Sequence, residues 1–504
     1  MNNSAGTRLP FLRLTGLTLA ALLIHGYHSG VEDGEIYVPA AKKLLNPNLY
    51  PFAPEFFLSH GHLSLFGSIL AWTSKLTHMS MDWTLLAWYV VSLFAILSSS
   101  WLFVAACFLN SRARWTAMLV VTAVLAMPAT NTGLLLVDPY LTARSLSTPL
   151  TLFALASLLE KRFVRVAIAV LITATIHPQM IVYLVFLAGV ILVAERKEAP
   201  VRKPVPVLAS VIGILPTGFH LTRATGPYRE ALYSRDYFFL YNWAWYHWLG
   251  MLAPLAILAW FWKGDLRGTR PAFQKISFAL IPFGLLSIVA ALILCSSPSF
   301  DMFARLQPLR SFHLITLLFV LLLAGIAGEY LGERRKWAPL ALFVPLAAGM
   351  YLVARQTYPN SDQVELPSKT SSNPWVNTLL WIRQNTPTDA VFAVDSRYFH
   401  DDLSDVHGFR ANSERSALAD YYKDSGVVSL FPALAPEWKQ MSNATYGLNH
   451  FSELQFRDLK QEYPQVTWTA IHGAAPAGLD CPYQQRGYSV CRMPAIQAST
   501  GTQL

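Results

Sequence analysis

The chain has 504 residues, of which 53% are hydrophobic and only 14% are charged. Soluble domains carry about 25% charged residues, so this composition excludes an ordinary soluble protein and predicts an integral membrane protein. The net charge of +9 is uneven, because residues 1–355 hold 28 Lys+Arg and 15 Asp+Glu, whereas residues 356–504 hold 11 and 15. The basic residues lie in short clusters between apolar runs, a pattern typical of membrane anchoring that gives no sign of a nucleic-acid partner.

Apolar runs close to the length of a membrane span, roughly 17–25 residues, follow one another along residues 1–355. We predict eleven spans: 11–28, 83–109, 115–132, 146–160, 164–177, 178–194, 205–222, 244–262, 273–295, 311–331 and 337–355. No small-residue cleavage site follows the first run, and further apolar runs come after it. It is therefore predicted to be an uncleaved span rather than a signal peptide.

The basic clusters alternate along these spans and predict their orientation. With the N-terminus in the cytoplasm, 18 of the 28 basic residues of this part face the cytoplasm, including every dense cluster. The segment 61–77 breaks the alternation if it is counted as a span. We therefore predict an interfacial or re-entrant helix within the first outer loop, 29–82.

From residue 356 the sequence becomes polar and net acidic, and the orientation places this part outside the cytoplasm. The pattern predicts a small α/β domain over 356–504, with helices at 373–386 and 414–422 and strands at 390–395, 466–471 and 487–493. Cys481 and Cys491 could form a disulfide in an oxidising compartment. Cys107 and Cys295 lie in apolar runs and are predicted to be core residues.

Polar side chains recur where predicted spans end on the outer side. Three acids, Glu32, Asp33 and Glu35, follow the first span within four positions. Other candidates are Tyr37, Asp138, Tyr140, Arg144, His177, Gln179, Arg305, Gln307, Arg310 and His313. Ionisable groups at membrane depth are costly, so they usually face a cavity or a partner.

These residue types suit chemistry on a phosphorylated lipid carrier. Arginines bind phosphate through paired hydrogen bonds, and histidine can orient a phosphate. A carboxylate can take the proton of an acceptor hydroxyl or help to hold a divalent cation, Mg or Mn, for which Asp33 and Asp138 are the candidate ligands.

Each of these residues also has a structural interpretation. The three acids could simply be solvated, and Asp138 could cap the helix that follows. Arg144 opposes the dipole at a helix start and needs a partner, for which Asp138 is the candidate. Arg310 could reach the lipid headgroups, and His177 could mark a kink before Pro178.

The layout resembles the GT-C superfamily of membrane glycosyltransferases. It shares spans that begin in the cytoplasm, a long first outer loop that opens with carboxylates, an interfacial helix in that loop and an outer C-terminal domain. It is most similar to an uncharacterised bacterial group of GT-C-like proteins, through VEDGEIYVPAAKKLLNPNLYPFAPEFF, DPYLTARS, HPQM, LQPLRSFHL, WIRQNTPTDAVFAV and FRANSERS. The tail lacks the WWDxG-type motif of oligosaccharyltransferases, which counts against transfer to protein sequons.

The resemblance implies a multi-pass enzyme of the bacterial inner membrane with its C-terminal domain in the periplasm. It would transfer a sugar from a polyprenyl-phosphate-linked donor to an unidentified acceptor, with inversion. The superfamily places functional acids in its first and second outer loops, which match Asp33 and Asp138. The base would be Asp33 or Glu35, and Arg305, Arg310 and Arg144 would hold the phosphate. Two alternatives stay open: a transporter or flippase of a lipid-linked or anionic solute, disfavoured by few mid-span charges and no repeat, and a non-catalytic scaffold.

Overall fold

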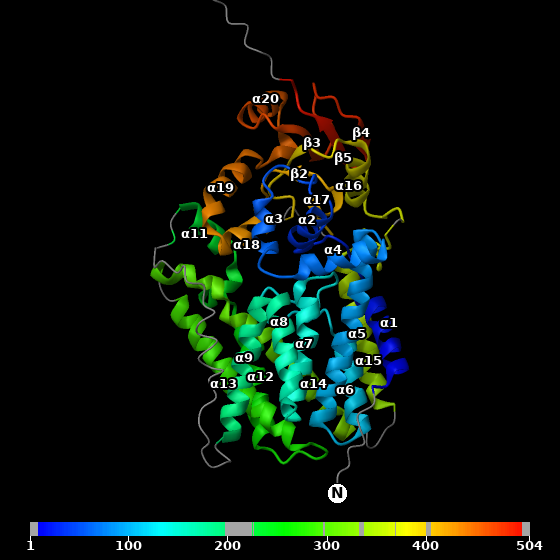
Figure 1. The fold of residues 1–504 in the computed structure, drawn as a ribbon, viewed down its shortest axis with the longest axis vertical. Coiled ribbons are helices and arrows are strands. Elements are labelled where there is room, and N and C mark those ends of the chain that lie inside the picture. The colour runs from blue at the N-terminus through cyan, green and yellow to red at the C-terminus, as the bar shows by residue number, and fades with distance from the viewer. Residues whose placement is uncertain are drawn as a thin grey trace, which may run out of the picture. The chain divides into compact units, whose positions relative to one another are not determined.

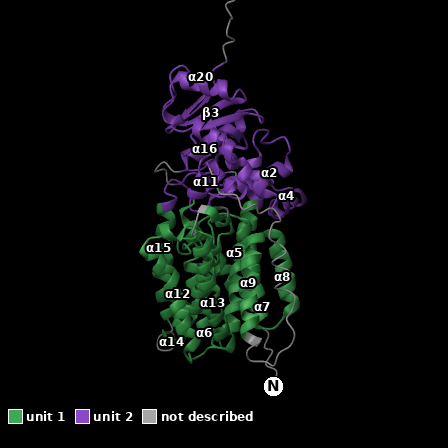
Figure 2. Cartoon of the chain, turned by 90° about the vertical axis from the view of Figure 1, so that its left-hand side faces the viewer, with its two compact units in different colours: residues 1–27, 85–224, 235–356 green, residues 28–84, 225–234, 357–504 purple. Residues whose placement is uncertain are grey.

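The computed structural model describes residues 9–196, 224, 226–295, 298–331, 337–367, 369–399 and 405–495 (Figure 1). The chain divides into two compact units, shown in different colours in Figure 2. Unit 1 comprises residues 1–27, 85–224 and 235–356, and unit 2 comprises residues 28–84, 225–234 and 357–504. The last break, after residue 356, lies one residue from the predicted boundary at residue 355, and the first loop is grouped with the C-terminal part of the chain.

Unit 1 is built from apolar helices. They are α1 (Phe11–His25), α5 (Met81–Cys107, in this unit from Leu85), α6 (Ser111–Ala123), α7 (Ala143–Leu159), α8 (Phe163–Ile176), α9 (Pro178–Arg196), α12 (Trp245–Lys263), α13 (Pro271–Leu294), α14 (Ser311–Leu331) and α15 (Ala338–Thr357). Short 3-10 turns η1 (Asp236–Phe238), η2 (Leu240–Asn242), η3 (Pro298–Leu306) and η4 (Pro308–Arg310) also belong to this unit.

Several of these helices suggest that the protein is associated with a membrane. Within the described residues, four helical segments are long and apolar enough to cross a bilayer: Met81–Cys107, Pro271–Leu294, Ser299–Leu331 and Ala338–Thr357. Shorter apolar helices cover Phe11–His25, Ala143–Leu159, Phe163–Ile176 and Pro178–Ala194. The predicted number of eleven spans is therefore not confirmed, and the predicted span 205–222 lies outside the described residues.

One predicted span is too long. The segment 115–132 was predicted as a single helix, but α6 ends at Ala123. Beyond it, Pro128 and Leu135 form an isolated bridge, and the amide of Leu136 donates to the carbonyl of Met127 at 2.9 Å. The apolar segment 124–132 therefore forms a folded-back loop and not a helix, and hydrophobicity alone does not separate the two.

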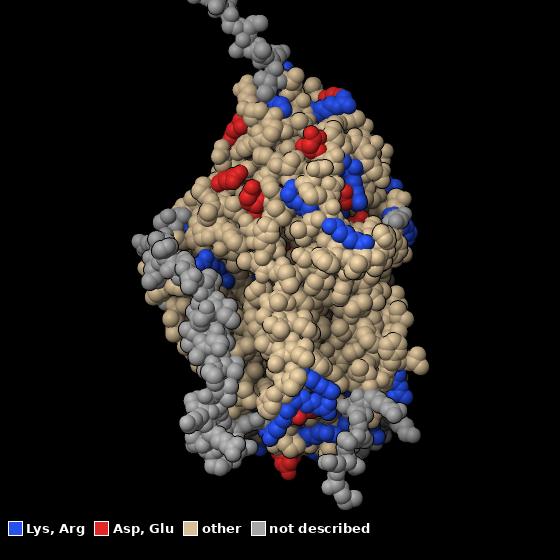
Figure 3. Space-filling view, in the orientation of Figure 1, with Lys and Arg blue, Asp and Glu red and all other residues tan. Residues whose placement is uncertain are grey.

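Two of the predicted basic clusters share one end of unit 1. The loop after α5 pairs with the loop before α13, where the amide of Leu109 donates to Gly268 at 2.8 Å and Phe108 bridges Thr269. Arg112 and Arg114 follow the first loop, and Arg270 ends the second. On the face drawn in Figure 3, Lys and Arg side chains gather at one end of this unit, beside a flank almost without charge.

Unit 2 combines helices with a small sheet. The first loop gives α2 (Gly34–Leu45), α3 (Glu55–Gly61) and α4 (Phe66–Thr77), and the short insertion gives α11 (Gly226–Tyr233). The C-terminal part gives α16 (Pro374–Asn385), α17 (Phe409–Ser413), α18 (Lys423–Leu430), η5 (Pro432–Leu434), α19 (Ala435–Ala444), η6 (Leu448–His450) and α20 (Glu453–Glu462). The predicted helix at 61–77 corresponds to α4, which begins five residues later, and its place at a membrane surface stays a prediction.

The sheet has the strand order β2-β1-β3-β5-β4. Its strands are β1 (Val391–Val394), β2 (Ser416–Ala417), β3 (Val466–His472), β4 (Tyr483–Gln485) and β5 (Tyr488–Arg492). Strand β1 is parallel to both β2 and β3, whereas β5 is antiparallel to β3 and β4. The predicted strands at 390–395, 466–471 and 487–493 are therefore confirmed.

Alternating residues of β1 supply the cores on the two faces of the sheet. Phe392 and Val394 pack with Trp375 and Leu379 of α16 in one core. Val391 and Ala393 pack in the other core with residues of α18, α19 and α20, such as Trp438. Phe56 and Ala231 also belong to this second core, so the first loop and the insertion at 226–233 are part of the interior of unit 2.

The predicted helix at 414–422 is wrong. Ser416 and Ala417 form β2, which pairs in parallel with β1. Glu414 has a φ of 56° and ends α17 in the left-handed region. The helix-forming composition is overridden because residues 415–420 are all buried, which an exposed amphipathic helix would not allow.

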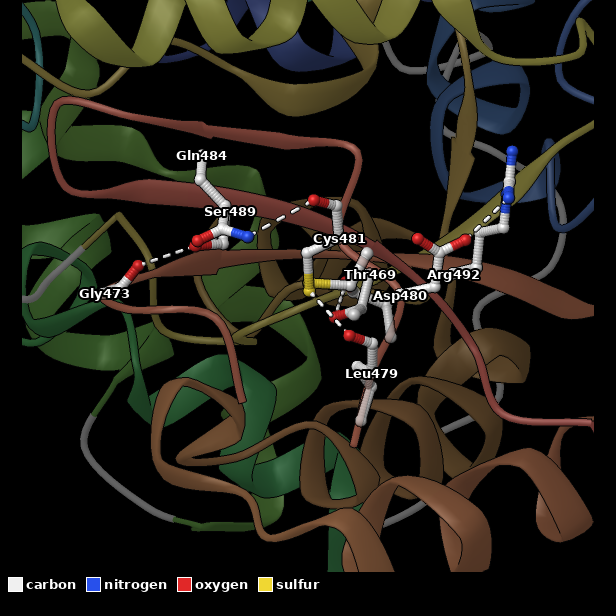
Figure 4. Close-up of a disulfide and its surroundings, with 10 residues drawn as sticks. Thr469, Gly473, Leu479, Asp480, Cys481, Gln484, Ser489 and Arg492 are labelled. Atoms are coloured by element: carbon white, nitrogen blue, oxygen red, sulfur yellow. Dashed lines mark hydrogen bonds and ion pairs between the residues drawn. A yellow bond between two sulfur atoms is a disulfide. The ribbon is translucent and has the colours of Figure 1, made fainter. Parts of the chain in front are cut away.

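Cys481 and Cys491 form the predicted disulfide, and Cys491 lies in β5, the strand between β3 and the edge strand β4 (Figure 4). Cys107 and Cys295 are free and buried. The bond closes a loop across a sequence separation of 10 residues. Loop-closure entropy then predicts a stabilisation of about 3 kcal/mol.

We expect two reactive thiols per chain when the protein is denatured without reductant, and four after reduction. Mass spectrometry after maleimide labelling measures both counts. The double variant Cys481→Ser/Cys491→Ser is expected to lower the free energy of unfolding of unit 2 by about 3 kcal/mol. Four thiols before reduction would contradict the bond.

Candidate functional site

The three acids of the first loop have different environments. Glu32 is exposed, has a φ of 49° and pairs with Lys423. Asp33 is half-buried at the N-cap position of α2, and its side chain makes no capping bond to that helix. Glu35, in the first turn of α2, is 1% exposed. The acids are therefore neither uniformly solvated nor equivalent.

Glu35 caps a helix that lies far away in sequence. Its two carboxylate oxygens accept the amide hydrogens of Arg410 at 2.9 Å and of Ala411 at 3.0 Å, in the first turn of α17. The first amides of a helix have no partner within that helix, and Gly408 at the N-cap has no side chain to supply one. A Cβ at Gly408 would lie 2.8 Å from that of Glu35, so the close approach needs glycine.

Burial governs the charge of this carboxylate. Desolvation raises the pKa of Glu35 to about 7, although Arg410 and the two amides oppose that shift. Arg410 is 3% exposed and also pairs with Asp424, with a distance of 2.9 Å from Nη1 to Oδ1. Desolvation also raises the pKa of Asp420, and the neighbouring carboxylate of Asp424 adds to that shift, so that the value is about 8. One guanidinium therefore faces three buried carboxylates, and not all of them can be ionised cheaply.

A small hollow lies beside this group in unit 2. Glu35, Asp395, Tyr398, Arg410 and Asp420 are among the residues that line its volume of about 10 Å³. That volume holds about one water molecule. The hollow is therefore suited to hydrating the buried charges, and it is too small to admit a sugar.

In unit 1, Asp138 and Arg144 form a buried ion pair, as the position of Arg144 at a helix start suggested. The side chains are 6% and 9% exposed. Asp138 does not cap the helix: Thr142 does, accepting the amide of Ser145 at 3.3 Å while the Ser145 hydroxyl accepts the amide of Thr142 at 3.1 Å. Asp138 and Arg144 also line a second hollow of about 10 Å³.

A second polar group in unit 1 surrounds Gln307, which has a φ of 50°. The hydroxyl of Tyr183 donates to its carbonyl at 2.8 Å, and Gln179 donates to Tyr183 at 3.0 Å and to the Gln307 side chain at 3.4 Å. Arg310 donates to the hydroxyl of Tyr237 at 3.3 Å and lies over its ring. Its Nε–H is buried, with no acceptor among the described residues.

His313 is a fully buried residue of α14 that interacts with both polar groups. It contacts the carbonyl of Leu136 at 3.0 Å through Nε2, and both Arg144 and Arg310 act on it electrostatically. Unit 1 therefore brings together six of the ten predicted binding residues: Asp138, Arg144, Gln179, Gln307, Arg310 and His313.

Of the other four predicted binding residues, Tyr37 belongs to unit 2, whereas Tyr140, His177 and Arg305 belong to unit 1. Tyr37 packs against His60 and Phe66 in unit 2. His177 follows α8 and accepts the amide of Met180 at 3.4 Å, and Tyr140 is buried. Arg305 is the penultimate residue of η3.

No metal site is evident among the described residues, since none of their His, Cys, Asp and Glu side chains gather in a group of three that could hold an ion. The two predicted ligands, Asp33 and Asp138, belong to different units. Sequence reasoning also missed Arg410, Asp420 and Asp424. Their only signal was the density of charge in FRANSER and ADYYKD, which usually indicates a solvated surface.

No protein-family model matches the sequence, and no curated protein matches it.

The raised pKa of Glu35 predicts a specific pH dependence of stability. Between the ordinary value of 4.5 and about 7, the folded state keeps a proton that the unfolded state has lost. This group's contribution to stability therefore falls as the pH rises through that window. We expect the difference in Tm between the unmodified protein and Glu35→Gln to fall by several degrees from pH 4.5 to 7.5, measured by differential scanning fluorimetry.

Asp458→Asn is the matched control, because Asp458 is an exposed acid of unit 2 whose removal should leave a flat difference curve. A Glu35→Gln difference that rises with pH, or that matches the control, would show that Glu35 is ionised throughout.

Proposed function

We propose that the protein is a membrane glycosyltransferase that uses a polyprenyl-phosphate-linked sugar donor. The observation that carries the proposal is the polar group in unit 1, where two arginines and a histidine gather among apolar helices. Polar side chains of this kind are costly in such surroundings and persist where they serve a ligand. The left-handed backbone of Gln307 adds support, because strained residues concentrate at functional sites.

Arg310 is the best candidate for the donor phosphate. Its guanidinium is held by Tyr237, and it has no carboxylate partner among the described residues. Arg144 is already neutralised by Asp138, so it can contribute to phosphate binding only if that pair opens. The imidazole of His313, held through Nε2, has no hydrogen-bond partner for Nδ1 in the described structure and could accept a substrate hydroxyl.

Asp33 is a better candidate for the general base than Glu35. Both oxygens of Glu35 accept backbone amides, and its side chain is almost fully buried. Asp33 is half-buried. In the proposed reaction, the acceptor oxygen bonds to the anomeric carbon as its proton passes to Asp33. The bond from that carbon to the phosphate oxygen breaks, and the polyprenyl phosphate leaves with the electron pair, where positive side chains stabilise its charge.

The proposal includes an outward-facing unit 2 and a cytoplasmic N-terminus. The disulfide in unit 2 favours an oxidising compartment. The gathering of basic residues at one end of unit 1 favours a cytoplasmic location for that end.

Arg310→Ala tests donor recognition. In nanodiscs, the unmodified protein is expected to bind a polyprenyl phosphate about 10- to 100-fold more tightly than the uncharged polyprenol of the same length, because charge-assisted hydrogen bonds contribute about 1.5–3 kcal/mol. Arg310→Ala should abolish that preference. Arg165→Ala is the control, since Arg165 is an exposed arginine of the same unit. An unchanged preference in Arg310→Ala would remove Arg310 from the site.

Asp33→Asn tests catalysis. In source cells that lack the chain, we expect a polyprenyl-linked sugar to accumulate, as measured by mass spectrometry. Asp33→Asn, expressed at normal abundance, should fail to clear it, whereas Asp458→Asn should restore the normal profile. Full restoration by Asp33→Asn would rule out Asp33 as the base. If cells that lack the chain show unchanged lipid-linked sugars and envelope glycans, that result contradicts the transferase proposal and favours a scaffold.

A further inference from the structure

Arg397 in unit 2 takes no part in the network around Glu35. It follows β1 by three residues, and its guanidinium lies over two rings, 4.7 Å from the centroid of Tyr421 and 4.6 Å from that of Tyr446. Its Nε is buried without a hydrogen-bond partner, and no described carboxylate pairs with its side chain. A half-buried cation held by aromatic rings alone still has unused donors for an anion.

The backbone beside this side chain is fixed. The Ser396 hydroxyl donates to the carbonyl of Ser442 at 2.7 Å, and its amide donates to that of Thr445 at 3.3 Å. The carbonyl of Ser396 accepts the amide of Tyr421 at 2.7 Å. These three bonds join the segments that carry Arg397, Tyr421 and Tyr446, so the arrangement is held before any ligand binds.

The position within the sheet independently points to a ligand site. Strand β1 lies between its two parallel neighbours, β2 and β3, and the chain runs from β1 to β2 and then to β3 on the opposite side. Connections from the carboxyl ends of these strands therefore diverge beside β1. In open α/β sheets, ligands bind in the crevice at such a switch point. Arg397 and Tyr421 come from the segments that follow β1 and β2.

The neighbouring charges favour an anion. Tyr421 donates to Glu230 at 3.2 Å, but Lys439 neutralises that carboxylate at 2.7 Å. Tyr446 is 59% exposed, so one ring remains accessible to a ligand. Arginine binds planar or tetrahedral anions by paired hydrogen bonds, and an exposed tyrosine offers an apolar face with a polar end.

We propose that Arg397, Tyr421 and Tyr446 form a binding site for an acidic sugar, whose carboxylate or phosphate binds Arg397 and whose ring packs on Tyr446. The site does not depend on the proposed transferase activity, since it requires neither Arg310 nor Asp33. If that activity is correct, the site would hold part of an acidic acceptor glycan.

The test uses the full chain in detergent with glucuronate, glucose 6-phosphate, glucose and inorganic phosphate as probes, and saturation-transfer NMR as the readout. We expect both acidic sugars to bind and glucose not to bind. Binding of glucuronate alone would identify a carboxylate site, and binding of glucose 6-phosphate alone would identify a phosphate site. If inorganic phosphate binds as tightly as glucose 6-phosphate, the sugar ring contributes nothing and the sugar part of the proposal is overturned.

Variants separate this site from general effects. Arg397→Ala should weaken binding at least about 10-fold, because charge-assisted hydrogen bonds are lost. Tyr446→Ala should weaken it less, and Arg397→Lys should retain part of it. Arg492→Ala is the matched control, because Arg492 is also an arginine over an aromatic ring, Trp468. Unchanged binding in folded Arg397→Ala would overturn the proposal, whereas Asp33→Asn should bind normally whatever its activity.

Discussion

The carboxylate of Glu35 is the constraint on which unit 2 depends. A buried carboxyl group is stable only when its hydrogen-bonding capacity is met, because its desolvation is costly. Here two amides of α17 donate hydrogen bonds to Glu35, and the guanidinium of Arg410 lies 3.9 Å from its Oε1 and also pairs with Asp424. The first loop and the C-terminal part are therefore not separate domains that touch. They form one hydrogen-bonded interior, closed by residues about 375 positions apart.

That interior explains which parts of the fold the sequence could predict. The helix at 374–385, the strands β1, β3 and β5 and the disulfide follow from local patterns: a capping Asn373 before a proline, short β-branched or apolar runs, and two nearby cysteines. The segment 414–422 could not be predicted in this way. Its residues have helical preferences, and pairing with β1 and burial place Ser416 and Ala417 in a strand instead.

The candidate site shows the same limit. Asp138 and Arg144 could be predicted as a pair because both residues lie within one turn and helix start. Glu35 could not be separated from Asp33 by sequence, because its partners lie in a segment whose charges looked solvated. Nothing in the local sequence FRANSER indicates that Arg410 is buried beside three carboxylates. Ion pairs between distant segments produce no periodic pattern in the sequence, whereas the burial of one face of a helix or strand does.

The fixed position of Glu35 also determines what Asp33 can do. Successive residues at the start of a helix turn by about 100°, so two residues separated by one position point to nearly opposite sides. Because Glu35 is held against α17, Asp33 is directed away from that contact and remains half-exposed. Glu32, in the left-handed conformation, pairs with Lys423 and places the turn before α2. The three acids thus have different surroundings: Glu35 and Glu32 hold the loop through their partners, and the side chain of Asp33 stays partly exposed.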